Sequence, residues 1–183
     1  MAMIDRTESG THESRNANEN KFLSFCLGDE QFGVEILRVR EIIGLIAITP
    51  LPQTPPYVRG VMNLRGRIIP VIDLRLRFGL PSTEATKETC IVVLEATEND
   101  GPQTVMGAIV DSVREVQDIP KSMIEPAPEF GCEIPLRYIL GMGKVKDKER
   151  DLVVVLLEIA EVIGMRDRVQ IAGAIKDTER RAA

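Results

Sequence analysis

Residues 60–74 have the sequence GVMNLRGRIIPVIDL, and this stretch decides the fold class. Residues 60–64 and 68–74 are rich in valine, isoleucine and leucine, which favours two β-strands. Between them, Arg65-Gly66-Arg67 supplies the glycine that a tight turn needs. The stretch therefore predicts an antiparallel β-hairpin.

Similar strand signals occur on both sides of this hairpin. Residues 22–27 and 31–34 predict a hairpin around a turn at 28–30, and residues 90–94 and 104–110 predict another around a turn at 99–102. A further apolar run spans residues 152–157. Short strands with closely spaced turns, and no alternation of strand and helix, favour small barrels over a parallel sheet.

The connecting segments differ in composition. A short helix is predicted over residues 37–43, and an amphipathic helix over residues 158 to about 175, followed by frayed residues 177–183. Four prolines make residues 45–56 an extended loop, because proline lacks a backbone donor and fixes φ. Residues 81–87 predict a polar linker, and residues 117–137 and 146–150 predict loops.

The chain also repeats itself. Gly33 is followed six residues later by Val-Arg-Glu-Ile, and Gly107 six residues later by Val-Arg-Glu-Val, at an offset of 107 − 33 = 74. Tyr57 and Gly60 match Tyr138 and Gly141 at an offset of 138 − 57 = 81, which places seven extra residues in the longer loop of the second half. This duplication predicts two similar small β-subdomains, which share apolar surface because each alone buries a thin core.

Composition disfavours several classes of function. The 183 residues carry a formal net charge of −5, and only 4% are aromatic, which disfavours binding to nucleic acid. The longest apolar runs are far below the roughly 20 residues that cross a bilayer, and the polar N-terminus lacks the apolar core of a secretory signal. We therefore expect a cytoplasmic protein.

Motifs of catalysis and metal binding are missing from the sequence. His12 is the only histidine, which argues against histidine-dependent acid–base chemistry and zinc sites. Cys26, Cys90 and Cys132 are widely spaced, and we interpret them as buried free thiols. The sequence has no phosphate loop, dinucleotide fingerprint or nucleophile elbow. We expect no catalytic residue, no metal and no cofactor.

In order along the chain, residues 22–36, 39–42, 57–75, 107–113 and 126–130 resemble the bacterial CheW coupling proteins. The resemblance runs from about residue 21 to residue 164. It implies a mainly β domain over residues 21–166, made of two intertwined five-stranded β-barrel subdomains, roughly residues 21–85 and 86–160, packed together with short helices and a C-terminal helix. We expect a disordered tail at residues 1–20, and the end of the helix with a tail at residues 167–183.

The resemblance also implies a function, that of a non-enzymatic scaffold. Such proteins bind the CheW-like regulatory domain of a CheA-type histidine kinase and the cytoplasmic helical tips of methyl-accepting chemoreceptors. We expect recruitment to membrane receptor arrays, without insertion into the membrane and without nucleic acid.

Individual residues fall on family positions at the receptor surface, a groove between the subdomains, where Glu41 and Arg65 would form an ion pair. These residues are Val39, Glu41, Gly60, Asn63, Arg65, Ile91 and Gly107. For the kinase, we place Ile46, Ile48 and Leu51 near the proline loop and Phe130 on the opposite side. The alternative interpretation is structural: the glycines would serve bulges, Val39 and Ile91 would fill the core, and Phe130 would fold back on it.

Three other functions remain open from the sequence. The same module could serve a kinase array with another output, such as surface motility or second-messenger synthesis. A small β-barrel that binds nucleic acid would need a basic face, which the charge balance disfavours. An enzyme is the third, and the missing motifs argue against it.

Overall fold

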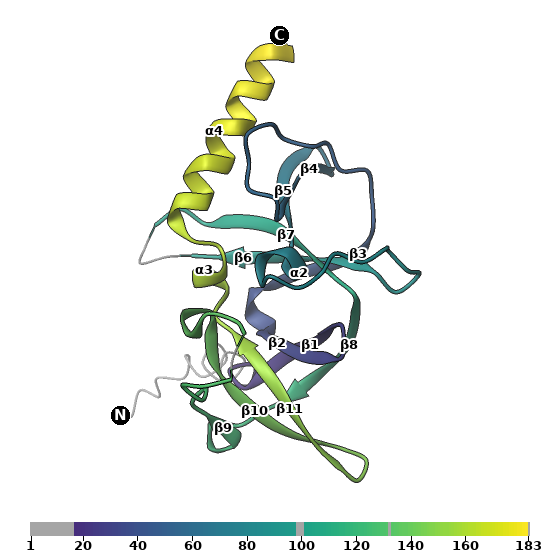
Figure 1. The fold of residues 1–183 in the computed structure, drawn as a ribbon, viewed down its shortest axis with the longest axis vertical. Helices are drawn as coiled ribbons and strands as arrows, with labels where there is room; N and C mark the ends of the chain where they lie inside the picture. The colour runs from purple at the N-terminus through teal and green to yellow at the C-terminus, as the bar shows by residue number, and fades with distance from the viewer. Residues whose placement is uncertain (1–16, 98–100, 132, 183) are drawn as a thin grey trace, which may run out of the picture.

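The computed structural model describes residues 17–97, 101–131 and 133–182, with elements labelled as in Figure 1. Residues 17–20 form a turn before the first strand, in which the backbone N–H of Lys21 donates to Asn18 O at 3.1 Å. Residues 1–16 of the expected tail, with His12, lie outside the described residues, as do Cys132 and part of the turn expected at 99–102.

Short strands dominate the described residues. The strands are β1 (Lys21–Leu27), β2 (Glu30–Glu35), β3 (Val39–Gly44), β4 (Val58–Leu64), β5 (Arg67–Asp73), β6 (Cys90–Ala96), β7 (Thr104–Val110), β8 (Ser112–Asp118), β9 (Ile124–Glu125), β10 (Ile139–Asp147) and β11 (Arg150–Leu157). The helices are α2 (Leu74–Arg77), α3 (Ile159–Val162) and α4 (Met165–Ala182), with 3₁₀ turns η1 (Ile36–Arg38), η2 (Lys121–Met123) and η3 (Leu136–Tyr138). No helix among the described residues is long and apolar enough to cross a membrane.

The strands form two sheets that exchange strands between the halves of the chain (Figure 1). Sheet A has the order β8-β1-β2-β11-β10-β9, and sheet B has the order β3-β6-β7-β5-β4. Parallel pairing of β11 with β2, and of β5 with β7, links each half to the other. The sheets therefore do not divide the chain at the expected boundary between residues 85 and 86.

This arrangement confirms a mainly β fold of two packed, barrel-like sheets. The sixth strand of sheet A, β9, contributes only two residues. The intertwining has a physical cause: a parallel neighbour cannot be reached by a tight turn, so each parallel partner comes from a distant part of the chain.

Backbone hydrogen bonds confirm the internal duplication. Asp73 N donates to Tyr57 O at 2.8 Å, and Glu158 N donates to Tyr138 O at 2.9 Å. The Asp73 side chain caps α2, and the Glu158 side chain caps α3. The β4–β5 and β10–β11 hairpins both shift register next to the repeated glycine, Gly60 or Gly141.

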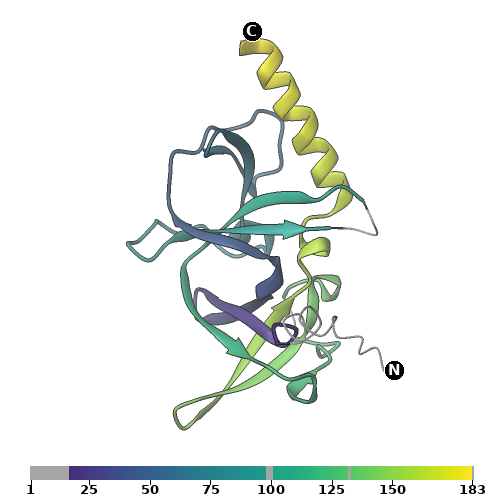
Figure 2. The ribbon, with the colours of Figure 1, turned by 180° about the vertical axis from the view of Figure 1, so that it is seen from behind.

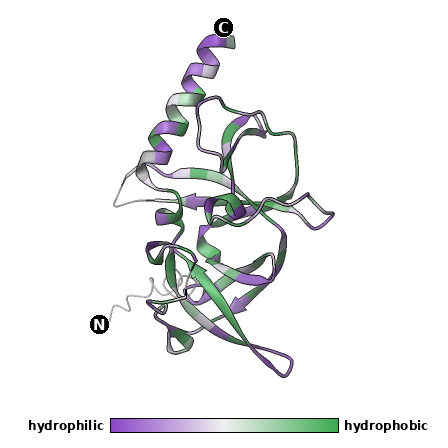
Figure 3. Ribbon diagram, viewed as in Figure 1, coloured by the Kyte–Doolittle hydropathy of each residue, from purple (hydrophilic) through white to green (hydrophobic). Residues whose placement is uncertain are grey.

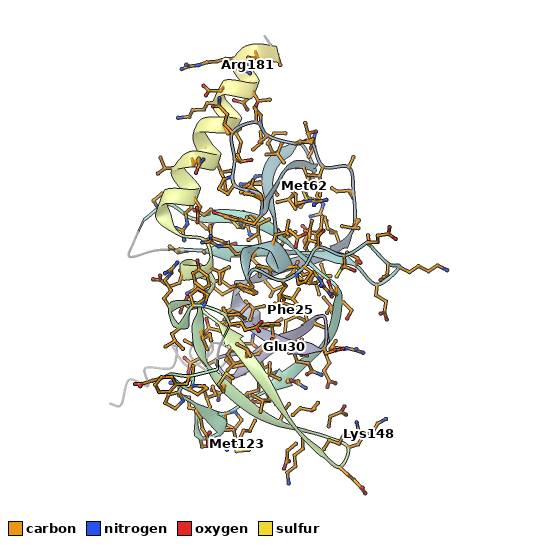
Figure 4. The ribbon with its side chains drawn as sticks, viewed as in Figure 1. Phe25, Glu30, Met62, Met123, Lys148 and Arg181 are labelled. Carbon is orange, nitrogen blue, oxygen red and sulfur yellow. The ribbon has the colours of Figure 1, made fainter. Side chains whose placement is uncertain are left out.

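The largest buried cluster lies between the two sheets. It includes Phe25, Phe32 and Phe78, whose rings stack in sequence with centroid distances of 5.9 and 5.6 Å. Figure 4 shows Phe25 in the middle of the molecule and Met62 inside sheet B, where a second cluster includes Met62 and Val71. A third cluster fills sheet A. The subdomains therefore share apolar surface, as predicted.

The side chain of Arg77 fixes the start of α4 against the two repeats. Its guanidinium carbon lies 4.4 Å from the ring centroid of Tyr57 and 5.1 Å from that of Tyr138. The same side chain donates to Val162 O at 2.8 Å and to Asp167 Oδ2 at 2.9 Å. Burial raises the pKa of the Tyr57 hydroxyl. Arg77 therefore joins α2, α3 and α4 in one partly buried contact.

The helix predicted over residues 37–43 is wrong. The chain makes the single turn η1 and then strand β3, which pairs with β6. Along β3, partly buried Val39, Glu41 and Ile43 alternate with exposed neighbours, which is the period of a strand. The pairing with β6, about 50 residues farther along the chain, overrides the local helical signal.

The helix predicted over residues 158 to about 175 begins close to its predicted start, with Glu158 as the cap of α3, but it is not continuous and its predicted end is wrong. Ile163 and Gly164 are not helical and separate α3 from α4, which continues to Ala182 across the residues expected to fray. In that last part, Thr178 Oγ1 donates to Ala174 O at 2.9 Å. Within the expected loop at 117–137, the short strand β9 pairs with β10.

Candidate partner-binding surfaces

The β4–β5 turn presents Arg65 at the edge of sheet B. Arg65 and Gly66 have φ values of 52° and 81°, so both positions of this two-residue turn have the left-handed backbone of a type I′ hairpin. Asn63 Oδ1 accepts a hydrogen bond from Gly66 N at 2.9 Å. Asn63 thus holds the turn, and the Arg65 side chain is left 76% exposed.

The carboxylate of Glu41 on β3 accepts hydrogen bonds from both terminal nitrogens of the Arg65 guanidinium. Arg65 Nη1 donates to Oε1 at 2.9 Å, and Nη2 donates to Oε2 at 2.8 Å. The predicted ion pair is therefore confirmed, and it links the two edge strands of sheet B. An exposed pair of this kind contributes only about 0–1 kcal/mol to folding, and the fork geometry fixes the direction of the remaining donors.

Three predicted receptor residues lie in the interior instead of on the surface. Ile91 is fully buried within sheet B. A Cβ on Gly107 would stand 2.7 Å from Ile91 Cγ2, and a Cβ on Gly60 would overlap the backbone of Thr49. These three residues shape the barrel from inside and cannot touch a partner in this conformation. Val39 is partly buried against the cluster between the sheets.

The sequence-based prediction missed Ile42 and Arg40 on the outer side of β3. Ile42 is 44% exposed and lies opposite Val92, a member of the buried cluster between the sheets. Ile42 is therefore an exposed apolar side chain on the opposite face of β3 from Glu41. Arg40 forms an ion pair with Glu95 on the neighbouring strand β6. The alternation of exposed and partly buried side chains along a strand would have indicated both residues, but a helix was predicted for this segment.

The residues predicted to bind a kinase divide into exposed and buried sets. Phe130 is 87% exposed in the segment between β9 and η3, the most exposed large apolar side chain among the described residues. Ile46 is 39% exposed, whereas Ile48 packs against the core of sheet B. Leu51 is buried in the cluster between the sheets and is not available to a partner. The exposed residues Ile46 and Phe130 remain candidates.

The ion pair of Arg75 with Asp111 stabilises the connection through which the chain passes from sheet B to sheet A. Asp111, between β7 and β8, accepts from Arg75 Nε at 2.8 Å and Nη2 at 2.6 Å, and from Gly28 N at 2.7 Å. Both side chains are less than a third exposed. Hydrogen bonding to Arg75 holds the pKa of the Asp111 carboxyl below its usual value.

We expect Asp111→Asn to lower the free energy of unfolding by about 2 kcal/mol at pH 7, because it removes charged hydrogen bonds from a partly buried site. A carboxyl whose pKa is lowered in the folded state stabilises above its unfolded pKa of about 3.9, and this contribution is lost as the pH falls through the folded pKa. The difference from wild type should therefore shrink below about pH 4. Urea titrations at several pH values measure it, with the exposed Asp118→Asn as control.

A metal centre has no support in the described residues, where no group of three or more His, Cys, Asp or Glu side chains could hold an ion. The surfaces described above consist of ion pairs and apolar side chains instead. Such features suit the binding of other proteins.

Comparison with known proteins identifies the family. The CheW-like domain family matches residues 21–167. The chemotaxis protein CheW of Klebsiella aerogenes is 34% identical over 156 residues, which cover 85% of this chain and 89% of the relative. Protein FrzA of Myxococcus xanthus is 33% identical over 134 residues, which cover 68% of this chain and 74% of the relative.

A solved structure shows the same fold. The scaffolding protein TtCheW from Thermoanaerobacter tengcongensis superposes with a TM-score of 0.70 at 32% identity, covering 81% of this chain and 90% of that one. The matches in sequence and in structure agree over most of the chain. We conclude that the chain belongs to the CheW-like domain family of non-enzymatic chemotaxis adaptors.

Proposed function

We propose that this adaptor couples the cytoplasmic tips of transmembrane chemoreceptors to a CheA-type histidine kinase. The observation that carries the proposal is the exposed Arg65, held in a fixed direction by Glu41 at the edge of sheet B. Membership of the CheW-like family, and relatives named for chemotaxis and scaffolding, support it.

The receptor surface in this proposal combines the exposed apolar side chain of Ile42 with the guanidinium of Arg65, whose orientation Glu41 fixes. A helical hairpin presents a narrow apolar face, which needs exposed apolar side chains flanked by charges that set its orientation. Ile42 supplies exposed apolar surface on β3, and Arg65 supplies hydrogen-bond donors at the edge of sheet B, where it pairs with Glu41 of β3. Carboxylates or exposed carbonyls on the receptor would accept from Arg65.

The kinase contacts in this proposal are Ile46, two residues after β3, and Phe130, between β9 and η3. In the proposal the adaptor binds receptor and kinase at the same time and transmits receptor state as a difference in binding free energy. The adaptor itself needs no catalytic group for this role.

The direct test adds the purified chain to receptor-containing membranes and a CheA-type kinase. We expect the chain to sediment with the membranes and to raise the rate of kinase autophosphorylation only when receptors are present. Membranes without receptors are the control. A folded chain that binds neither partner would refute the proposal.

Replacing Phe130 tests the kinase surface separately. We expect Phe130→Ala to weaken kinase binding about tenfold, because an exposed aromatic side chain of this size is a typical interface anchor. Its melting temperature should stay at the wild-type value, since the side chain buries little surface. Isothermal titration with the kinase regulatory domain measures the affinity, and unchanged affinity would remove Phe130 from the interface.

A further inference from the structure

Helix α4 packs beside sheet B, and its Gln170 side chain donates to Gln53 O at 3.0 Å. Its residue Ile171 is 3% exposed and belongs to the same buried cluster as Val58 and Val61 of β4. The helix also borders one groove together with Pro70 of β5 and Thr104 and Val105 of β7. Figures 1 and 2 both show α4 running along this sheet. Sheet B is thus completed by an amphipathic helix of its own chain.

The equivalent face of sheet A has no such helix. The repeat relates Val58 and Val61 to Ile139 and Met142, at the offset of 81. It relates Thr104 and Val105 to Glu30 and Gln31 at the offset of 74, and Pro70 to Val155 through the equivalent pairings of β5 and β11. All five of these sheet A residues line an open groove of about 470 Å³.

The connectivity explains why the chain leaves this groove uncovered. After Gly164, the chain continues into the 18 residues of α4. After the equivalent Gly79, only residues 80–89 remain before the chain must enter β6. Leu80 reaches the groove, and residues 81–88 are exposed. A helix comparable to α4 does not fit in this connection.

Apolar and acidic side chains line the groove together. Leu152, Val153 and Val155 of β11 line it, and Val153 is 52% exposed. Figure 3 shows the hydrophobic colouring of β11 along this strand. Asp29, Glu30 and Glu133 stand among the lining residues, and none of these residues is a lysine or an arginine. Exposed apolar surface with one sign of charge around it is typical of a protein-binding site.

We propose that this sheet A groove binds a basic amphipathic helix of a partner protein. The internal repeat indicates the shape of the ligand, because the equivalent face of sheet B holds α4. The acidic residues of the groove indicate its charge, and the α4 sequence, with five basic and three acidic residues, has a net charge of 5 − 3 = +2. The proposal goes beyond receptor and kinase coupling and does not depend on it.

A labelled peptide with the sequence of residues 165–182 tests the proposal against the full chain by fluorescence anisotropy. We expect saturable binding that Val153→Lys weakens at least tenfold, because lysine removes apolar surface and repels the basic peptide. The matched control is Ile68→Lys, the equivalent position of sheet B, which is 48% exposed and should leave binding unchanged. Replacing Arg168, Lys176, Arg180 and Arg181 of the peptide by glutamate should also weaken binding at least tenfold.

Three outcomes would overturn the proposal. Absence of saturable binding would remove the helix site, and equal weakening by both lysine variants would remove its location in sheet A. A dimer of the chain alone, seen by sedimentation velocity and abolished by Val153→Lys, would assign the groove to a second copy instead of a partner protein. Melting temperatures of both variants should match wild type, since both side chains are about half exposed. No receptor or kinase is present, so the result is independent of the coupling function.

Discussion

Gly60→Ala is expected to lower the free energy of unfolding by about 3–5 kcal/mol, enough to unfold a marginally stable domain. Gly60 has a φ of 139°, a conformation that residues with a side chain rarely adopt. A Cβ there would also overlap the backbone of Thr49, whose N–H and C=O pair with Val61 at 2.8 and 2.9 Å. The substitution must therefore displace backbone and not a flexible side chain. Urea denaturation followed by circular dichroism measures the loss.

Gly44→Ala is the matched control for this prediction. Gly44 also lies in sheet B, and a Cβ there would meet no atom within 4 Å. We expect its stability to remain within about 0.5 kcal/mol of wild type. If Gly60→Ala folds as stably as Gly44→Ala and loses only receptor binding, then Gly60 contacts the receptor and its structural role is wrong.

Arg65→Glu is expected to reduce receptor-dependent kinase stimulation at least tenfold with little change in melting temperature. The side chain is 76% exposed, so folding depends little on it, whereas the new carboxylate would repel Glu41 and any receptor carboxylate. Autophosphorylation with receptor-containing membranes measures the effect. Arg67→Glu makes the same change of charge at an exposed position of the same hairpin and should retain most of the stimulation.

The exchanged pair Glu41→Arg with Arg65→Glu separates two roles of the ion pair. It keeps opposite charges at the edge of sheet B and removes the donor at position 65. We expect stability to match wild type and stimulation to stay low. Full recovery of stimulation would mean that the pair only shapes the surface and that Arg65 does not touch the receptor.

The hairpins, whose turns depend on neighbouring residues, could be predicted from the sequence. The type I′ turn at Arg65-Gly66 depends on residues within the hairpin, and the predicted hairpin is present. The repeat could be read because Tyr57 and Gly60 recur as Tyr138 and Gly141 in equivalent backbone roles. The ion pair of Glu41 with Arg65 followed from resemblance to the CheW family, not from local pattern. The same resemblance predicted Ile91 and Gly107 at the receptor surface, but it carries no information on how deeply a side chain is buried, and both residues lie inside sheet B.

The sequence by itself determined the hairpins, the duplication, the absence of helix–strand alternation and the family. The tertiary structure alone decided the exchange of strands between the halves and which face of each strand is buried. The physical reason is the range of the interactions: a turn depends on a few neighbouring φ and ψ angles, whereas Gln31 pairs with Val154, 123 residues away. The same long-range packing places α4 on sheet B and leaves the equivalent groove of sheet A open.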